Sequence, residues 1–165
     1  MILGDVGVGK SSLITNYVHN TFVENNESTV LDIYRGRKTA SKQEIEIELH
    51  DSPGDDHLSQ RLTYDFKSAD AFIICIAANN RHSLQNIEKW TNMIDTLSSK
   101  APLFLVLTKS DLKGAVTLEQ LRDIRNRDSR FQGAYKTSAK EWMDFNVHKA
   151  FNKVLQSTLS IKYNI

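Results

Sequence analysis

Residues 4–11 are Gly-Asp-Val-Gly-Val-Gly-Lys-Ser, and this stretch decides the fold. It matches the phosphate-loop pattern G-x-x-x-x-G-K-S/T, which requires a buried strand before it and a helix after it. Residues 1–3 are apolar and typical of the end of such a strand, and residues 10–20 carry apolar side chains at helical spacing. The sequence therefore predicts a strand, a loop and a helix that together bind the phosphates of a nucleotide.

Each residue type in this loop suits phosphate chemistry. Glycines let the backbone turn several N–H groups toward one point, which creates a nest for an anion. Lys10 adds a positive charge for the outer phosphates, the helix N-terminus adds a favourable dipole, and the Ser11 hydroxyl is a candidate ligand of Mg²⁺. The predicted phosphate-binding residues are Gly4, Asp5, Val6, Gly7, Val8, Gly9, Lys10, Ser11, Ser12 and Gly54.

Composition favours one soluble globular domain. The chain has 165 residues, of which 40% are hydrophobic and 25% are charged. A formal net charge of +1 gives no support for nucleic acid as the main ligand. We find neither a signal peptide nor an apolar run that could span a membrane. The single cysteine, Cys75, lies in an apolar run, so we expect a buried core thiol without a disulfide, which fits the cytosol.

Strands and helices alternate along the predicted structure. Strands are predicted at residues 34–40, 44–50, 71–77, 103–107 and 134–136, and helices at 10–20, 83–96, from 117 onward, and 147–159. The strand at 44–50 alternates Glu with Ile or Leu, which places it near a sheet edge. Thr117 and Gln120 predict a capping box. We expect an α/β fold with a mostly parallel six-stranded sheet, one antiparallel strand, and helices on both faces.

Polar motifs follow several of the predicted strands directly. In parallel sheets, ligands bind outside the carboxyl ends of the strands. Asp51 is placed to hold Mg²⁺ through water, because this ion keeps several waters and takes few carboxylates. Gly54, three residues on, lets a backbone N–H approach the terminal phosphate. Residues 108–111 and 137–140 follow two later strands, so the motifs should gather at one edge of the sheet.

The order of these motifs resembles that of the small GTPases of the Ras superfamily, over nearly the whole chain. They are the phosphate loop, a switch threonine at Thr29, D-x-x-G from Asp51, N/T-K-x-D ending at Asp111, and S-A-K from Ser138. The resemblance implies a P-loop NTPase G domain that uses GTP or GDP with Mg²⁺. The implied metal ligands are Ser11, Thr29 and, through water, Asp51; Thr29 would also sense the γ-phosphate.

The same resemblance implies a guanine site. Its residues would be Phe22, Thr108, Lys109, Asp111, Ser138, Ala139 and Lys140. The Asp111 carboxylate would accept hydrogen bonds from guanine N1–H and the exocyclic amine, a donor pair that adenine lacks. This disfavours an ATP-using enzyme. The alternative role for Phe22 is plain core packing, and the alternative for Lys140 is that of a solvated surface lysine. Thr108 stands at a position where Asn is commoner in the family.

Within the superfamily the chain is most similar to Rab proteins. Residues 28–30 and the stretches 64–70 and 83–90 carry this likeness, although Leu31 replaces a usual glycine. It implies a switch in vesicle trafficking that meets exchange factors and effectors through its switch regions. The expected location is cytoplasmic or peripheral on the cytosolic face of an endomembrane. The row Glu44, Glu46 and Glu48 is either a solvated face or part of a partner surface.

Two departures from the family pattern bear on hydrolysis. The implied catalytic residues are Lys10, Thr29 and Asp55, but Asp55 replaces the glutamine that orients the attacking water. Val6 replaces a smaller residue and crowds the space that an arginine finger enters. Slow GTP hydrolysis is therefore expected.

Two interpretations of the chain remain open at this point. One is a GTPase with slow turnover; the other is a degenerate G domain that acts as a nucleotide-holding scaffold or as one lobe of a larger protein. The short run before the phosphate loop favours one lobe of a longer protein. We expect residues 1–165 to form a single G domain that is truncated at both ends. Residues 162–165 contain no cysteine, so a prenyl anchor would need a tail beyond them.

Overall fold

The structure is a computed structural model that describes residues 1–22, 32–40, 43–54, 60–97, 100–141 and 146–164. Its strands are β1 Ile2–Leu3, β2 Asp32–Ala40, β3 Gln43–Asp51, β4 Phe72–Ala77, β5 Leu103–Thr108 and β6 Phe131–Lys136. Its helices are α1 Lys10–His19, α2 Gln60–Ser68, α3 Arg81–Gln85, α4 Ile87–Thr96, α5 Leu118–Arg127 and α6 Asn146–Tyr163. The described elements thus alternate much as the sequence predicts.

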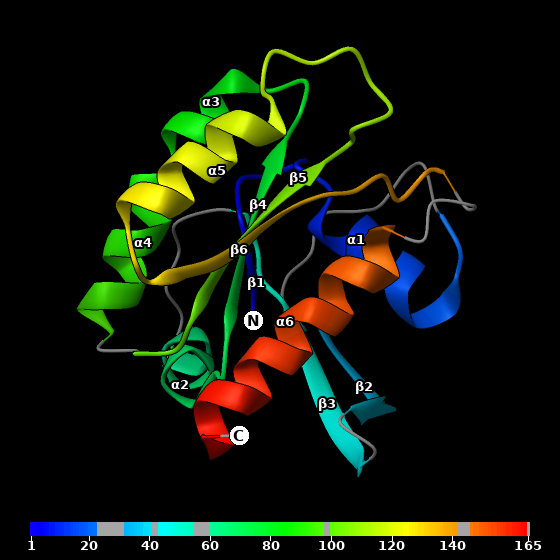
Figure 1. The fold of residues 1–165 in the computed structure, drawn as a ribbon, viewed down its shortest axis with the longest axis vertical. Helices are drawn as coiled ribbons and strands as arrows, with labels where there is room; N and C mark the ends of the chain where they lie inside the picture. Colours follow the sequence, from blue (N-terminus) through cyan, green and yellow to red (C-terminus); the bar gives the residue numbers. More distant parts are fainter. Residues whose placement is uncertain (23–31, 41–42, 55–59, 98–99, 142–145, 165) are drawn as a thin grey trace.

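The strands form one sheet in the order β2-β3-β1-β4-β5-β6 (Figure 1). Every neighbouring pair is parallel except β2 and β3, which are antiparallel. This confirms the predicted six-stranded, mostly parallel sheet with one antiparallel strand. Strands β4 and β5, which lie in the interior of the sheet, are buried at every position, as continuous apolar runs require.

Helices cover both faces of the sheet, and each face has its own apolar cluster. On one face, Phe66 of α2, Trp90 of α4 and Leu121 of α5 pack with side chains of β4 and β5. On the other face, α1 and α6 pack on the sheet through residues such as Tyr17 and Phe151, whose rings stack at 4.2 Å. The sheet is therefore a rigid platform whose strand ends can position a site.

Three local details differ from the predicted elements. The helix expected at 83–96 is two helices, α3 and α4, which meet at Asn86. The helix α2 was not among the predicted elements, and α6 runs on to Tyr163. The predicted capping box of α5 is confirmed: Gln120 N–H donates to Thr117 Oγ1 at 3.4 Å and Thr117 N–H donates to Gln120 Oε1 at 2.8 Å.

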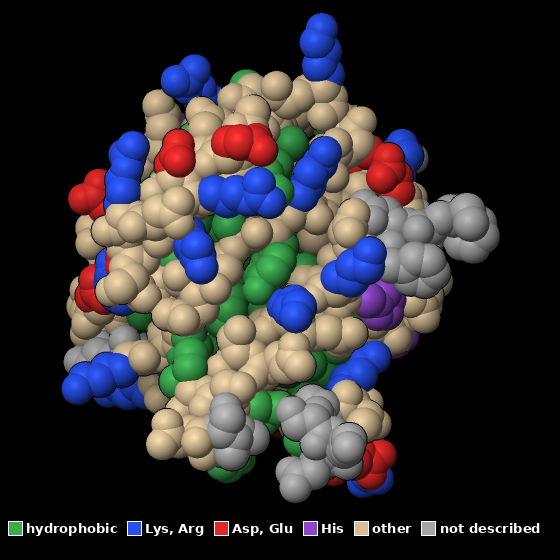
Figure 2. Space-filling model, in the orientation of Figure 1, with side chains coloured by type: hydrophobic (Ala, Val, Ile, Leu, Met, Phe, Trp, Pro, Cys, Tyr) green, Lys and Arg blue, Asp and Glu red, His purple; other side chains and the backbone are tan. Residues whose placement is uncertain are grey.

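Charged side chains are spread over the face that carries α5 and α6, where Lys and Arg lie among Asp and Glu (Figure 2). Several charged side chains among the described residues form ion pairs. Arg130 Nη1 lies 2.6 Å from Asp95 Oδ1, and its Nη2 lies 2.6 Å from Asp128 Oδ2. Lys162 at the end of α6 pairs with Asp70 at 2.6 Å. Among the described helices, none combines the length and the hydropathy that crossing a bilayer would need.

Candidate nucleotide-binding site

The phosphate loop connects β1 to α1 at the carboxyl end of the sheet. Gly4, Gly7 and Gly9 have φ values of 139°, 74° and 98°, which favour glycine because other residues are strained there. A Cβ on Gly4 would also lie 2.6 Å from the carbonyl oxygen of Cys75 on β4. Backbone conformation thus favours glycine at all three positions, and close packing on β4 adds a second reason at Gly4.

Lys10 lies at the start of α1 with its ammonium inside the loop. Its Nζ donates to the carbonyl oxygens of Gly4 at 2.8 Å and Asp5 at 3.0 Å, and the side chain is only 6% exposed. A buried ammonium needs such acceptors because desolvation of a charge is costly. The loop therefore holds the cation at the concave side, where the phosphates of a nucleotide would lie.

The D-x-x-G motif closes over the same loop. Asp51 ends β3 fully buried, and the hydroxyl of the next residue, Ser52, donates to Ile2 O at 2.7 Å. A Cβ on Gly54 would lie 2.3 Å from the backbone N of Val6. Only a glycine leaves this close approach open. Gly54 and the phosphate loop thus form two sides of one cradle, as the sequence predicts.

The donor set in this cradle fits a Mg²⁺–nucleotide complex. Hard oxygen ligands are available from the Ser11 hydroxyl and the Asp51 carboxylate, and phosphate and water oxygens would complete the shell. The described residues contain no cluster of three His, Cys, Asp or Glu side chains that could hold a metal by themselves. A metal here would consequently be shared with the phosphates and would neutralise their charge.

The motifs after β5 and β6 lie together and support one another. Ser138 is fully buried, and its Oγ donates to Asp111 Oδ1 at 2.6 Å. Ser110 N–H donates to Thr137 O at 3.1 Å, and Asn16 of α1 donates its amide to Ala139 O at 3.0 Å. The hydrogen bond from Ser138 orients the carboxylate of Asp111 and leaves its second oxygen available as an acceptor.

Two residues of the predicted guanine site also touch the phosphate loop. Lys109 has φ 54° and donates from Nζ to Gly7 O at 2.6 Å, and Thr108 is buried with its hydroxyl against the carbonyl of Val8. Phe22 and Lys140 are exposed at the rim. The base-binding and phosphate-binding motifs are therefore one connected unit.

Some predicted residues lie outside the described residues. These are Thr29 of the first switch, with its neighbours Ser28 and Val30, and Asp55 and His57 after D-x-x-G. The structure therefore leaves the metal role of Thr29 and the catalytic role of Asp55 as predictions. Val6, the other departure from the family pattern, is described, and its side chain is 67% exposed.

Sequence reasoning missed Asn86 and Trp90. Asn86 Nδ2 donates to Asp5 Oδ2 at 2.9 Å, and Trp90 Nε1 donates to Asp5 Oδ1 at 3.2 Å. The only signal that points to them is an aspartate inside a phosphate loop, whose carboxylate needs donors from elsewhere. The sequence does not say which donors, because they come from the junction of α3 and α4.

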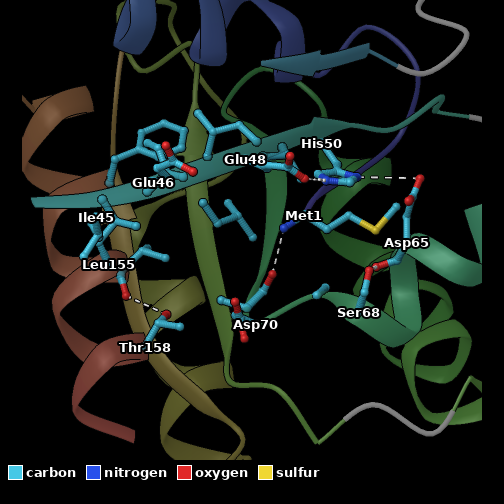
Figure 3. Close-up of a pocket in the computed structure, with 18 of the residues that line it drawn as sticks. Met1, Ile45, Glu46, Glu48, His50, Asp65, Ser68, Asp70, Leu155 and Thr158 are labelled. Atoms are coloured by element: carbon cyan, nitrogen blue, oxygen red, sulfur yellow. Dashed lines mark hydrogen bonds and ion pairs between the residues drawn. The ribbon is translucent and has the colours of Figure 1, made fainter. Parts of the chain in front are cut away.

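A second hollow lies apart from this site, between β3, α2 and α6 (Figure 3). Its volume is about 810 Å³, and none of the predicted nucleotide-binding residues lines it. His50 Nδ1 and Asp65 Oδ2 face each other there at 3.6 Å, and Glu48 contacts the other ring nitrogen at 3.4 Å. This groove thus links the end of β3 to α2 and lies away from the phosphate loop.

The comparisons with known proteins agree with this site. A model of the Ras family matches residues 1–160. The chain therefore belongs to the Ras family and is a small GTPase by class. Proteins of this family bind GTP or GDP with Mg²⁺ and in general hydrolyse GTP.

Two relatives are examples of the proteins to which this chain is similar in sequence. The chain is 29% identical over 158 residues to the "Ras-like protein rasU" of Dictyostelium discoideum. The aligned residues cover 94% of this chain and 72% of that protein. It is 34% identical over 119 residues to the "Rho-related GTP-binding protein RhoV" of Bos taurus, covering 72% of this chain but only 50% of that protein. The predicted similarity to Rab proteins has no counterpart in these two names and stays a prediction.

Proposed function

We propose that this protein is a guanine-nucleotide switch that binds GTP or GDP together with Mg²⁺. One observation carries the proposal: the Lys10 ammonium and the carboxylate of Asp111 are both preformed at the carboxyl ends of the strands, on a single connected loop system. The first is suited to the outer phosphates and the second to the guanine donors. Family membership supports the same assignment.

In this proposal each described group has a separate task. Backbone N–H groups of the phosphate loop and Lys10 hold the phosphates, Ser11 and Asp51 hold the metal directly and through water, and Gly54 meets the terminal phosphate. Asp111, which is exposed in this structure, would select guanine because another base lacks the donor pair for its carboxylate oxygens. Thr29 would join the metal shell only in the triphosphate state, which makes the switch.

Slow hydrolysis is a further part of the proposal. The exposed Val6 side chain stands on the loop next to Gly54, where an approaching arginine would have to enter. Asp55 lacks the amide that would donate to the transition state. Loss of one such donor costs about 2–4 kcal/mol of barrier, and that corresponds to roughly a hundredfold or more in rate.

The cellular role is proposed from sequence likeness alone. Resemblance to Rab proteins in residues 64–70 and 83–90 favours a role in vesicle trafficking, with exchange factors and effectors as partners. It also favours a cytoplasmic protein that is peripheral on an endomembrane. These partners would bind through the switch regions around Thr29 and after Gly54.

The decisive experiment identifies the nucleotide that co-purifies with the protein and measures its affinity with and without Mg²⁺. We expect GDP or GTP, faster release after chelation of Mg²⁺, and loss of binding in Lys10→Ala. Lys100→Ala, at an exposed lysine, is the matched control.

A second experiment compares the mobility of the switch regions with GDP and with a GTP analogue, and we expect it to differ between the two nucleotides. An identical response to both nucleotides would instead favour a scaffold.

Single-turnover hydrolysis tests the catalytic part. The double variant Val6→Gly/Asp55→Gln should hydrolyse bound GTP at least about a hundredfold faster than the parent. Asp123→Gln, on the exposed side of α5, should leave the rate unchanged. If the double variant is no faster than the parent, the two departures do not limit the reaction.

A further inference from the structure

Asp5 of the phosphate loop is held by side chains that lie outside the loop. Its carboxylate sits beside a site built for anionic phosphates, yet it does not point toward them. Both of its oxygens are engaged from behind, Oδ2 by Asn86 Nδ2 at 2.9 Å and Oδ1 by Trp90 Nε1 at 3.2 Å. We call these three side chains, Asp5, Asn86 and Trp90, the Asp5 clamp.

The two donors are themselves firmly held. Asn86 is the residue at which α3 ends and α4 begins, and its N–H donates to His82 O at 3.1 Å. Trp90, one turn into α4, is 2% exposed and belongs to the apolar cluster on that face of the sheet. Donors fixed by packing cost little further entropy when they bind a carboxylate, so the clamp should be strong.

The clamp reaches the phosphates through the backbone of Asp5. The carbonyl oxygen of Asp5 accepts a hydrogen bond from Lys10 Nζ at 3.0 Å. The peptide that follows, from Asp5 to Val6, is the one against which Gly54 packs, since a Cβ on Gly54 would lie 2.7 Å from Asp5 C and 2.3 Å from Val6 N. One anchored side chain therefore sets the place of the lysine and of the D-x-x-G backbone.

We infer that Asn86 and Trp90 are positioning residues of the nucleotide site, which act through Asp5 to hold the phosphate loop in its binding conformation. This inference rests on the proposed function. Both donors contact the site through Asp5 of the phosphate loop, so their effect should fall on the phosphate half of the ligand. The junction of α3 and α4 thereby sets how long GDP or GTP stays bound.

A polarity swap tests the clamp. Asp5→Asn places an amide against two donors, and Asn86→Asp places two carboxylates face to face. The double variant Asp5→Asn/Asn86→Asp restores both bonds: the introduced amide oxygen accepts from Trp90, and its nitrogen donates to the introduced carboxylate. Trp90→Phe is the mild variant that keeps an aromatic ring in the core and removes one donor. Thr91→Val, which removes a hydrogen bond to Glu88 O within α4, is the matched control.

Two readouts are needed, the release rate of a fluorescent GDP analogue and the ³¹P spectrum of bound GDP. Each clamp single variant should release GDP about ten- to a hundredfold faster, because a hydrogen bond to a charged group is lost. The polarity swap should return close to the parent rate, and Thr91→Val should match the parent. The β-phosphate resonance should move in the single variants and return in the swap.

Three results would overturn the inference. One is GDP release at the parent rate in Asn86→Asp and Trp90→Phe. Another is a loss of thermal stability with unchanged phosphate resonances, which would leave the clamp a purely structural role. The third is a swap that shows no rescue. If the parent protein binds no guanine nucleotide, the proposed function fails and this inference fails with it. If the parent binds nucleotide normally and one of the three results is found, only the inference about the clamp fails.

Discussion

Thr108 donates its hydroxyl to the backbone carbonyl of Val8 at 2.5 Å, so the end of β5 supports the phosphate loop from behind. The same hydroxyl lies 3.1 Å from Ile76 O on β4, and the side chain is 3% exposed. The residue that stands in place of the commoner Asn in the N/T-K-x-D motif thus ties three segments together. In this structure the Thr108 hydroxyl binds the backbone of the phosphate loop.

Replacing Thr108 by Val should weaken both the fold and nucleotide binding. The change keeps the shape but leaves the buried carbonyl of Val8 without this donor, which costs about 1–3 kcal/mol of unfolding free energy. Urea denaturation and GDP release measure the two effects. Thr108→Ser, which keeps the hydroxyl, should stay close to the parent. Equal stability of the Val and Ser variants would contradict the assigned role.

Replacing Gly54 by Ala should weaken nucleotide binding strongly. The new Cβ would meet the backbone of the phosphate loop at Val6, and backbone cannot yield as a flexible side chain does. We expect at least about tenfold faster GDP release, from strain of 1–3 kcal/mol or more. Gly36→Ala on β2, where nothing lies within 4 Å of the new Cβ, is the control and should release GDP like the parent.

The Cys75 thiol should be unreactive in the folded protein. Burial raises its pKa to about 12. At pH 8 the reactive thiolate is then only about one part in ten thousand. Ellman's reagent should modify the protein quickly in concentrated guanidinium and very slowly in native buffer. Ser129→Cys adds an exposed thiol and should give one fast equivalent; fast modification of the parent would show that β4 opens readily.

The pair of Asp128 and Arg130 should make stability depend on pH. The hydrogen bonds from the Arg130 side chain hold the pKa of Asp128 below its ordinary value. A carboxylate with a lowered folded-state pKa stabilises the fold above its ordinary pKa of about 4, and this contribution disappears as the pH falls through the folded value. The pair is partly exposed, so we expect no more than about 1 kcal/mol.

The variant Asp128→Asn measures this contribution. Denaturant unfolding should find the parent more stable than the variant at pH 6, and the difference should shrink below pH 4. Asp123→Asn, at an exposed aspartate of α5, provides a control for the change in net charge. A difference between parent and Asp128→Asn that does not vary with pH would argue against the ion pair as its cause.

Much of the fold could be predicted because local signals agreed with it. The alternation of Ile45, Ile47 and Leu49 with glutamates identifies β3, and continuous apolar runs identify β4 and β5. The capping box of α5 is encoded by two residues three positions apart. In each case the signal lies within the element itself, so no tertiary information was needed.

The break between α3 and α4 could not be predicted in this way. Leu84, Ile87, Trp90 and Ile94 share one helical face, and that spacing favours a single helix. The break at Asn86 coincides with its contact to Asp5, which is 81 residues away in sequence. Helix α2 has few apolar residues, and it is held by Phe66, which is buried against Phe72 of β4 at 5.3 Å between ring centroids.

The candidate site likewise has some features that could be predicted from the sequence and others that could not. Its glycines, Lys10, Asp51 and Asp111 belong to motifs whose spacing predicts their place at the carboxyl ends of the strands. The hydroxyl bond from Ser138 to Asp111 and the indole bond from Trp90 to Asp5 join different motifs. Such bonds depend on how strands and helices pack, and a single sequence contains no pattern for them.

The place of β2 and β3 at one edge of the sheet also has a consequence for how the molecule opens. These two strands are paired along nine residues, and their hairpin borders the other strands through β3 alone. In native-state hydrogen exchange the hairpin should behave as a separate cooperative unit that unfolds before the β4–β5 core, and it would carry Asp51 with it.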